Sequence, residues 1–314
     1  MCREGTRIDK RQLKGTLKEY SDNSSKQTFL QATGEKEESW QDTVKYLMTS
    51  DLNSPAYEII RHKITIPIVA NIPHSSIAIP QDIRESLLLN EPELEQELLC
   101  MTDRYVDELF ACIGVIGGVA IKFSNSRLVL DPERFLDDEK EIMASRGMGV
   151  IYLKTSKGHD LRKTLSEENR NNLINRFYKP YHKAIEQEAA CMLERFGKCL
   201  IIDCHSFSSK PLPHEPNQEQ DRPDICLGTD TFHTPDKVTE TMEASFRKAG
   251  LTSKRNMPFE GTYVPLRYLN NNSRVSSIMV EVNRKLYMDE ATGEKNGDFL
   301  RIKEITDNTV KSLS

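Results

Sequence analysis

LIIDCHSFSS, residues 200–209, is the stretch around which the chain is organised. Its apolar residues lead into Asp203 and His205, and Gly197 stands shortly before it. This order predicts the end of a helix, a short buried strand, and a histidine in the loop at the carboxyl end of that strand. Ligands of open α/β sheets bind at the carboxyl ends of strands, so His205 could reach a metal ion or a substrate. The alternative is a histidine that only caps the strand, and this stretch alone does not decide between the two.

A second strand followed by a histidine lies far upstream. Residues 64–70 have the composition of a strand, and NIPHSS, residues 71–76, brings His74 directly after them. Strands that are distant in sequence can lie close together in one sheet. The repeated arrangement therefore favours a functional site that includes His74 and His205.

The last clear strand, residues 276–284, carries a glutamate among apolar residues. Strand alternation places Glu281 on the face opposite to Val280 and Val282. A carboxylate in such a strand is costly unless it is paired or used. We therefore interpret Glu281 as a functional residue.

Two arginines flank a short segment that follows a predicted strand pair. Arg127 and Arg134 could each bind a carboxylate with the planar fork of the guanidinium group. The alternative is a surface salt bridge, for instance between Arg127 and Asp131. Their order in the sequence leaves both interpretations open.

A helix is predicted from Asn90, a suitable N-cap, to about residue 112. Asp103 and Asp107 lie four residues apart within it and would share one face. The default interpretation of both is a solvated acidic face. A second, long helix is predicted over residues 167–196 with a kink near Pro180, and its His182 is interpreted as a packing or surface residue.

Two loop histidines, a carboxylate and a glutamate on a strand are the usual components of a mononuclear zinc hydrolase. The metal lowers the pKa of a water molecule towards about 7 and polarises a carbonyl group. A separate carboxylate must then carry the proton to the leaving nitrogen, and Glu281 is the candidate. Three cationic side chains are available for an acidic substrate or an oxyanion: Arg127, Arg134 and Arg284.

Other classes of protein are disfavoured. The H-E-x-x-H, G-x-S-x-G, P-loop and G-x-G-x-x-G motifs are absent. A net charge of −5 and the lack of a long apolar run give no reason to expect nucleic acid or membrane as a partner. The seven cysteines are odd in number and form no C-x-x-C pair, so we expect neither a zinc ribbon nor a disulfide framework, and we expect a cytoplasmic location.

The length of 314 residues suits one large α/β domain. Residues 1–45 are polar and charged, which predicts a mobile N-terminal extension without assigned chemistry. Residues 46–314 are then expected to form a single catalytic α/β domain.

Five short motifs carry a resemblance to a known family. They occur in this order: NIPHSS (71–76), DRYVDELF (103–110), SRLVLD (126–131), DCHSF (203–207) and VEVNRKLYM (280–288). Together they resemble the N-formylglutamate amidohydrolases, over residues 66–290. Each motif is short, but five in the same order are fairly specific.

The resemblance implies a three-layer α/β/α domain like that of the zinc carboxypeptidases, with a mixed, mainly parallel central sheet. It also implies hydrolysis of an N-formyl or similar N-acyl acidic amino acid, with about one Zn²⁺ per chain. By position, His74 and His205 would be metal ligands and Glu281 the general base. Arg127 and Arg134 would bind the substrate carboxylate or the oxyanion.

Two positions depart from the carboxypeptidase pattern. That pattern has a glutamate three residues after the first histidine, where this chain has Ile77. Another element must supply the ligand, and Asp103 is the candidate because it opens the second motif. Glu133-Arg134 also stands in place of the Asn-Arg pair that carboxypeptidases use for a terminal carboxylate, which leaves the exact substrate open.

Two alternatives to this function remain at the level of the sequence. One is a non-catalytic protein that binds a small carboxylate on the same fold. The other is an amidase that acts on peptides or cell-wall fragments. Its pocket size would depend on the loops at residues 135–165 and 210–223.

Overall fold

The computed structural model describes residues 55–314, so the expected extension over residues 1–45 lies outside the described part, and the domain division stays a prediction. The strands are β1 (Tyr57–Arg61), β2 (Ile68–Ile72), β3 (Val119–Phe123), β4 (Cys199–Phe207), β5 (Ile225–Gly228), β6 (Ser253–Arg255) and β7 (Val275–Asn283). The helices are α4 (Gln81–Arg84), α5 (Glu91–Met101), α6 (Val106–Leu109), α7 (Cys112–Val115), α8 (Glu167–Leu173), α9 (Lys179–Phe196), α10 (Asp236–Lys248) and α11 (Phe299–Lys311). Short helical turns are η2 (Ile142–Arg146), the π-helical η3 (Ile174–Tyr178) and η4 (Arg284–Leu286). Among these described helices, none has both the length and the apolar character of a membrane span.

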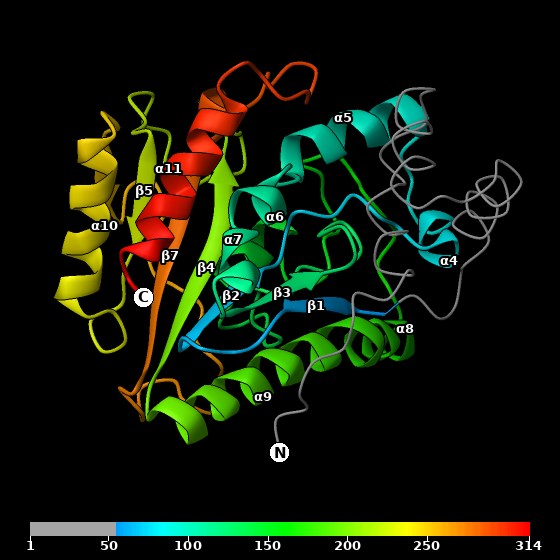
Figure 1. The fold of residues 1–314 in the computed structure, drawn as a ribbon. Coiled ribbons are helices and arrows are strands. Elements are labelled where there is room, and N and C mark those ends of the chain that lie inside the picture. The colour runs from blue at the N-terminus through cyan, green and yellow to red at the C-terminus, as the bar shows by residue number, and fades with distance from the viewer. Residues whose placement is uncertain (1–54) are drawn as a thin grey trace, which may run out of the picture. The chain divides into compact units, whose positions relative to one another are not determined.

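The strands form one sheet in the order β1-β3-β2-β4-β7-β5-β6 (Figure 1). Strands β3, β2, β4 and β7 are parallel to their neighbours in that run, while β1 and β5 are antiparallel to β3 and β7. The expected mixed, mainly parallel sheet is therefore confirmed. Because β2, β4 and β7 run in the same direction, their carboxyl ends meet at one edge of the sheet.

The register of these strands decides which side chains share a face. Asn71 lies opposite Asp203, and His205 lies opposite Glu281. Since side chains alternate along a strand, all four project from the same face. The predicted alternation of the last strand is confirmed, because Val280 belongs to the apolar core on the other face.

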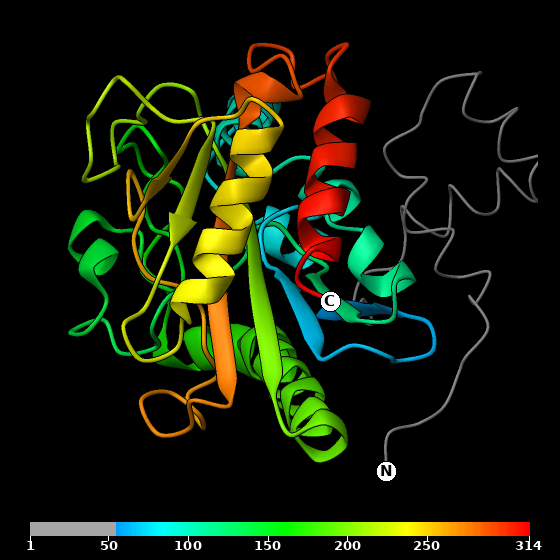
Figure 2. The same cartoon turned by 60° about the vertical axis from the view of Figure 1, so that its left-hand side comes forward.

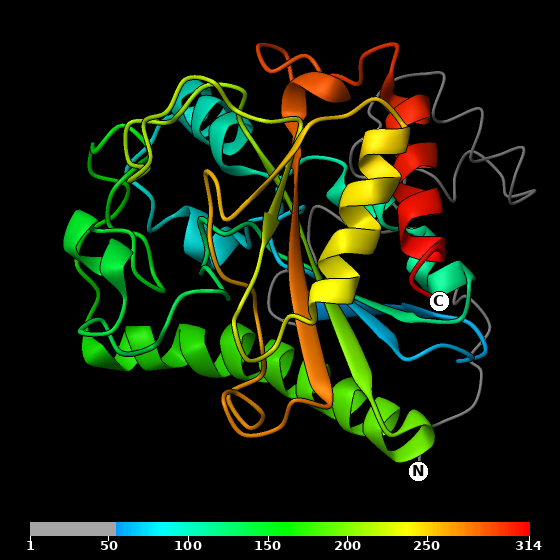
Figure 3. The same cartoon turned by 90° about the vertical axis from the view of Figure 1, so that its left-hand side faces the viewer.

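Helices cover both faces of the sheet. The apolar face packs against α6, α7, α10 and α11, and α10 and α11 lie beside each other (Figures 2 and 3). In α10, Met242 and Phe246 are four residues apart and point into this core. The long helix α9 packs against β2, β3 and β4, with Tyr181 edge-on to Phe123. The expected three-layer α/β/α arrangement is therefore confirmed.

The single helix predicted over residues 90–112 is wrong. The helix starts as expected, with Asn90 in a capping box, but α5 ends at Met101 and α6 and α7 follow separately. Thr102 is extended, and Tyr105 has a left-handed backbone (φ 65°). The break turns Asp103 into the interior, where its main-chain N–H donates to the His74 carbonyl oxygen at 2.9 Å.

The face that Asp103 and Asp107 were expected to share therefore does not exist. Asp103 is buried, whereas Asp107 accepts a hydrogen bond from Lys122 at 2.6 Å. Asp107 thus forms an ordinary ion pair with Lys122. For Asp103, the interpretation as part of a solvated acidic face is wrong.

The helix predicted over residues 167–196 is interrupted. Ser166 caps its start and Gly197 follows its end, as expected. The π-helical turn η3 comes between α8 and α9, immediately before Pro180 in the first turn of α9. Proline has no N–H to donate to the preceding turn, so a wider turn there is a local way to accommodate it.

Candidate active site

The three predicted metal ligands converge at the carboxyl ends of β2 and β4. The imidazole rings of His74 and His205 have centroids 5.1 Å apart. Asp103 Oδ2 lies 3.8 Å from Nδ1 of His74 and 3.2 Å from Nδ1 of His205. All three side chains are buried. Their ligand atoms are close enough together to hold one metal ion.

In both imidazole rings, Nε2 lies within hydrogen-bond distance of a carboxylate. His74 Nε2 is 2.8 Å from Asp131 Oδ1. His205 Nε2 is 3.1 Å from Asp203 Oδ1 and 3.0 Å from Glu133 Oε2. A carboxylate on one ring nitrogen is the usual device that orients a metal-binding histidine. In both residues this leaves Nδ1 on the side of Asp103.

Nδ1 of His74 is buried and has no hydrogen-bond partner within the described part of the chain. Burial and the nearby Arg127 lower the pKa of His74 to about 4, so the ring is neutral near pH 7. Because Nε2 donates to Asp131, Nδ1 carries a free lone pair that points towards the group formed with Asp103. An orphaned acceptor in this position fits a bound cation.

His205 and Asp103 form a charged pair. Burial opposes the charge on His205, but Glu133 and Asp203 raise its pKa well above the usual value. Burial likewise opposes the Asp103 carboxylate, but hydrogen bonding to His205 and the charge of Arg284 lower its pKa. A proton on His205 thus balances the surrounding carboxylates, and a metal cation would replace that proton.

A second group, made of Glu133, Asp203 and His205, also has ligand atoms close enough for one cation. The carboxylates of both groups already have donors: Asn71 Nδ2 donates to Glu133 Oε1 at 2.7 Å and to Asp203 Oδ1 at 2.8 Å, and Arg284 donates to Asp103. The first group differs in that it includes a buried nitrogen, Nδ1 of His74, with no hydrogen-bond partner among residues 55–314. The group of His74, Asp103 and His205 is therefore the better candidate metal site.

Glu281 stands directly opposite His205 on the neighbouring strand. Its side chain is buried, and its Oε2 atom has no hydrogen-bond partner among the residues that the structure describes. Burial raises the pKa of Glu281 to about 8. A free carboxylate oxygen beside the candidate metal ligands is in a suitable place to exchange a proton with a reacting water.

The two arginines beside His74 differ in how firmly they are held. Arg127 donates to Asp131 Oδ2 at 2.6 Å and to the Tyr152 hydroxyl at 3.1 Å, so the ion pair considered as the alternative is present. Arg134 is held more loosely, with its Nε 3.5 Å from Asp131 Oδ2 and a quarter of its side chain exposed. Arg134 is thus the freer of the two to bind a further carboxylate.

Arg284 contacts a candidate metal ligand. It donates to Asp103 Oδ1 at 2.9 Å, to the Cys100 carbonyl oxygen at 2.7 Å and to Ser206 Oγ at 3.2 Å. Its side chain is buried. These contacts orient Asp103, while the expected binding of substrate by Arg284 stays a prediction.

Several residues of the site were not singled out from the sequence. Asp203 stands two residues before His205, and that spacing in a strand could have shown that the two side chains share a face. Asp131 is fully buried and accepts hydrogen bonds from His74, Arg127 and Tyr152. Tyr152 comes from a loop without periodic pattern, so no signal in the sequence marked it.

Asp131→Asn is expected to lower the free energy of unfolding by about 3–5 kcal/mol, because it leaves the guanidinium of Arg127 without its buried counter-charge. Chemical denaturation of the purified proteins measures this loss. Asp137→Asn is the control, since Asp137 makes an exposed ion pair with Lys140 and should change stability by less than about 0.5 kcal/mol. Equal free energies of unfolding for the two variants would contradict a stabilising role of the buried cluster around Asp131.

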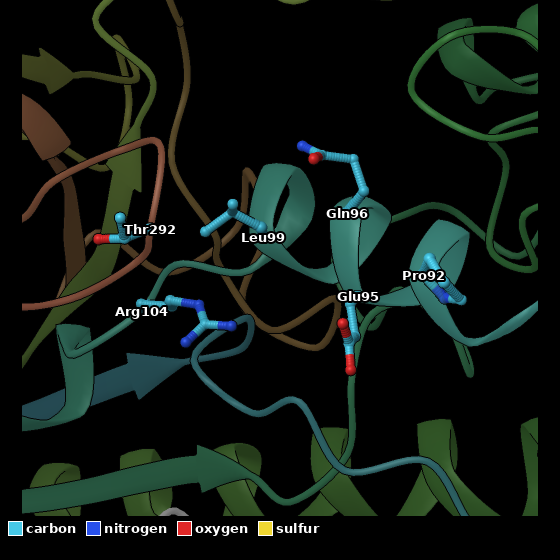
Figure 4. Close-up of a pocket in the computed structure, with 6 residues that line it drawn as sticks. All are labelled: Pro92, Glu95, Gln96, Leu99, Arg104 and Thr292. Carbon is cyan, nitrogen blue, oxygen red and sulfur yellow. The ribbon is translucent and has the colours of Figure 1, made fainter.

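A separate pocket of about 440 Å³ lies outside this group (Figure 4). None of the predicted site residues lines it. Its lining residues are Pro92, Glu95, Gln96, Leu99, Arg104 and Thr292. Its lining includes no histidine and none of the candidate metal ligands, so this pocket is not the candidate active site.

The chain is similar to known proteins over most of its length. Residues 66–288 match the family model described as N-formylglutamate amidohydrolase. An N-formylglutamate deformylase from Pseudomonas putida is 25% identical over 234 residues, which is 73% of this chain and 84% of that protein. An N-formylglutamate deformylase from Pseudomonas aeruginosa is 26% identical over 231 residues, covering 72% and 83% of the two chains.

The fold is also found in a solved structure. The crystal structure of N-formylglutamate amidohydrolase from Ralstonia eutropha JMP134 superposes with a TM-score of 0.72 at 21% identity. The match covers 83% of this chain and 97% of that one. At this identity the likeness establishes the shared fold.

Proposed function

The chain belongs to the N-formylglutamate amidohydrolase family, and from that premise we propose that it is a zinc-dependent enzyme that removes the formyl or a similar acyl group from an N-acylated acidic amino acid. Membership makes it a hydrolase of a carbon–nitrogen bond and disfavours the non-catalytic binding protein. The observation that carries the proposal is the convergence of His74, Asp103 and His205 around the orphaned Nδ1 of His74, with Glu281 opposite His205.

The residues that would hold the metal are His74, Asp103 and His205. When bound there, zinc would polarise the amide carbonyl, lower the pKa of a water molecule and favour the ionised form of Glu281. Two neutral imidazoles and one carboxylate are a donor set that suits zinc and leaves a position open in a tetrahedral site. Asp131 and Asp203 would keep the two imidazoles in the required orientation.

Glu281 would act as the proton carrier. Its unpartnered Oε2 accepts a proton from the attacking water and then donates it to the nitrogen that leaves as the amine of the amino acid. The water oxygen joins the carbonyl carbon, and the carbon–nitrogen bond breaks. Hydrolysis of N-formylglutamate in this way gives formate and glutamate.

Arg127 and Arg134 would bind the acidic part of the substrate or the oxyanion. Arg127 is fixed by Asp131 and Tyr152, which suits an oxyanion that develops at one position. Arg134 is partly exposed and less tightly held, which suits a carboxylate brought by the substrate.

Arg134→Ala is expected to raise KM for N-formylglutamate by about 10–100-fold, because a hydrogen bond to a charged group contributes about 1.5–3 kcal/mol. Steady-state kinetics measure this, and the effect should be smaller for an uncharged N-formyl amide. Arg301→Ala, which removes an exposed arginine of α11, is the control. An unchanged KM in Arg134→Ala would exclude Arg134 from binding the carboxylate.

A panel of N-formyl and N-acyl amino acids, extended to short peptides and cell-wall fragments, tests the substrate class. We expect turnover of N-formylglutamate with release of formate, and little turnover of peptides. Preferred turnover of peptides would favour the amidase alternative. No turnover of any member by zinc-loaded protein would overturn the proposed function.

We further propose that residues 46–314 form a single catalytic domain that acts on a small-molecule carboxylate in the cytoplasm. Residues 55–79 and 83–314 form one compact unit, which supports the single domain. Limited proteolysis followed by an activity assay tests this division. Loss of activity on removal of residues 1–45 would contradict it.

A further inference from the structure

Two aromatic side chains where η3 meets α9 contact the segment 132–134. Tyr178 donates its hydroxyl hydrogen to the Arg134 carbonyl oxygen at 3.2 Å. His182 Nε2 lies 2.7 Å from the Pro132 carbonyl oxygen. The two rings stack, with centroids 3.9 Å apart and planes at 23°. This stacked pair thus holds two carbonyl groups of the segment that carries Glu133 and Arg134.

The position of the proton on His182 follows from its two partners. A carbonyl oxygen only accepts, so Nε2 carries the hydrogen that is donated to Pro132. Nδ1 must then accept, and its partner is the Tyr263 hydroxyl at 3.0 Å. Burial lowers the pKa of His182 to about 4, in agreement with a neutral ring. The main-chain N–H of Tyr263 in turn donates to Asp203 Oδ2 at 2.9 Å.

The interrupted helix places this pair. Tyr178 ends the π-helical turn η3, and His182 lies four residues later in α9, on the same side of the helix. A π-turn changes the direction in which the following side chains point, and such turns are frequent at functional sites. The interpretation of His182 as an ordinary packing or surface residue does not explain why both of its nitrogens have defined partners.

We infer that His182 is a positioning residue that holds the Pro132–Arg134 segment so that the guanidinium of Arg134 meets the carboxylate of the substrate. The inference rests on the proposed function. It assigns no direct contact between His182 and the substrate. It predicts that changes at His182 act on substrate binding through Arg134.

His182→Phe keeps an aromatic ring against Tyr178 and removes both hydrogen bonds. It is expected to raise KM for N-formylglutamate about tenfold, to change kcat by less than about threefold, and to leave the zinc content unchanged. His182→Gln can still donate to Pro132 and should restore most of the binding. Lys183→Gln, at the exposed neighbouring position, is the control and should behave as wild type.

A double-mutant cycle separates positioning from a general loss of structure. In an Arg134→Ala background, His182→Phe should change KM by less than about twofold, since the group through which it acts is already gone. Additive effects of the two substitutions would overturn the inference. So would a fall in kcat with unchanged KM. Thermal unfolding shows whether His182→Phe keeps its fold, and if it does not, the ¹⁵N-histidine spectrum of the wild-type protein carries the test.

A measurement that needs no activity tests the hydrogen bond itself. In protein labelled with ¹⁵N-histidine, we expect His182 to be neutral with its proton on Nε2 throughout the neutral pH range, and its signal to shift in Tyr263→Phe. A proton on Nδ1, or titration of His182 near neutral pH, would overturn the inference. If wild-type protein fails to hydrolyse N-formylglutamate, the proposed function fails, and this spectrum still decides the placement of His182.

Discussion

Glu281→Gln is expected to lower kcat for N-formylglutamate by about 10²–10⁴-fold, the usual contribution of a positioned general acid–base group. Glutamine has nearly the same size, so the substitution removes the charge and the basic oxygen without opening a cavity. Zinc content should stay at about one per chain, because Glu281 is proposed to move protons and not to hold the metal. Steady-state kinetics and metal analysis on the same samples measure both.

A matched substitution controls for unspecific effects. Glu304→Gln changes an exposed glutamate of α11 and should leave kcat within about twofold of wild type. Retention of most activity in Glu281→Gln would remove Glu281 from the mechanism. A parallel loss of zinc and activity would instead make Glu281 a metal ligand.

His205→Ala is expected to abolish zinc binding and activity together. The imidazole is one of three candidate ligands. Loss of a residue that merely orients a ligand lowers metal affinity by about 10–100-fold, and loss of the ligand itself should lower the affinity further. The substitution also leaves Glu133 and Asp203 side by side without the imidazole that lies between them and Asp103. Metal analysis after dialysis against a buffered zinc solution gives the result directly.

The control for this loss is another histidine. His159→Ala removes an exposed side chain from the 135–165 loop and should keep full zinc content and activity. Circular dichroism of His205→Ala shows whether the fold survives. A folded His205→Ala variant that retains one tightly bound zinc would show that the metal is held elsewhere, for which Glu133 and Asp203 would be the first residues to examine.

The sequence predicted those parts of the fold and site that depend on local pattern. Strand alternation correctly separated Glu281 from Val280, and the two histidine-bearing stretches meet at the carboxyl ends of parallel strands. Both results follow from a period of two and from the common direction of β2, β4 and β7. They require no knowledge of distant contacts. His74 follows β2 as predicted, but the loop predicted for His205 is wrong, because β4 continues to Phe207 and pairs His205 with Glu281 of β7.

The remaining parts depend on contacts between distant residues. The apolar spacing predicted an unbroken helix through Asp103, but the hydrogen bond from its main chain to His74 and the ion pair with Arg284 favour a break there. The helix propensity of the neighbouring residues carries no information about these two distant partners. The identification of Asp103 as a candidate ligand came from its place in a family motif, and its helical surroundings had favoured a solvated surface.

His182 was underestimated for a similar reason. A histidine in the middle of an amphipathic helix most often packs or faces solvent, and nothing in the neighbouring sequence contradicts that. Its partners, Pro132 and Tyr263, are about 50 and 81 residues away. Only the folded arrangement shows that both of its nitrogens are used.

The central claim is that a metal held by His74, Asp103 and His205 is required for hydrolysis of an N-acylated acidic amino acid. The most direct measurement is the rate of formate release from N-formylglutamate before zinc removal, after removal by a chelator, and after zinc is added back. The account predicts that activity disappears with the metal and returns when about one zinc is bound per chain. Undiminished formate release by protein shown to be free of metal would contradict it.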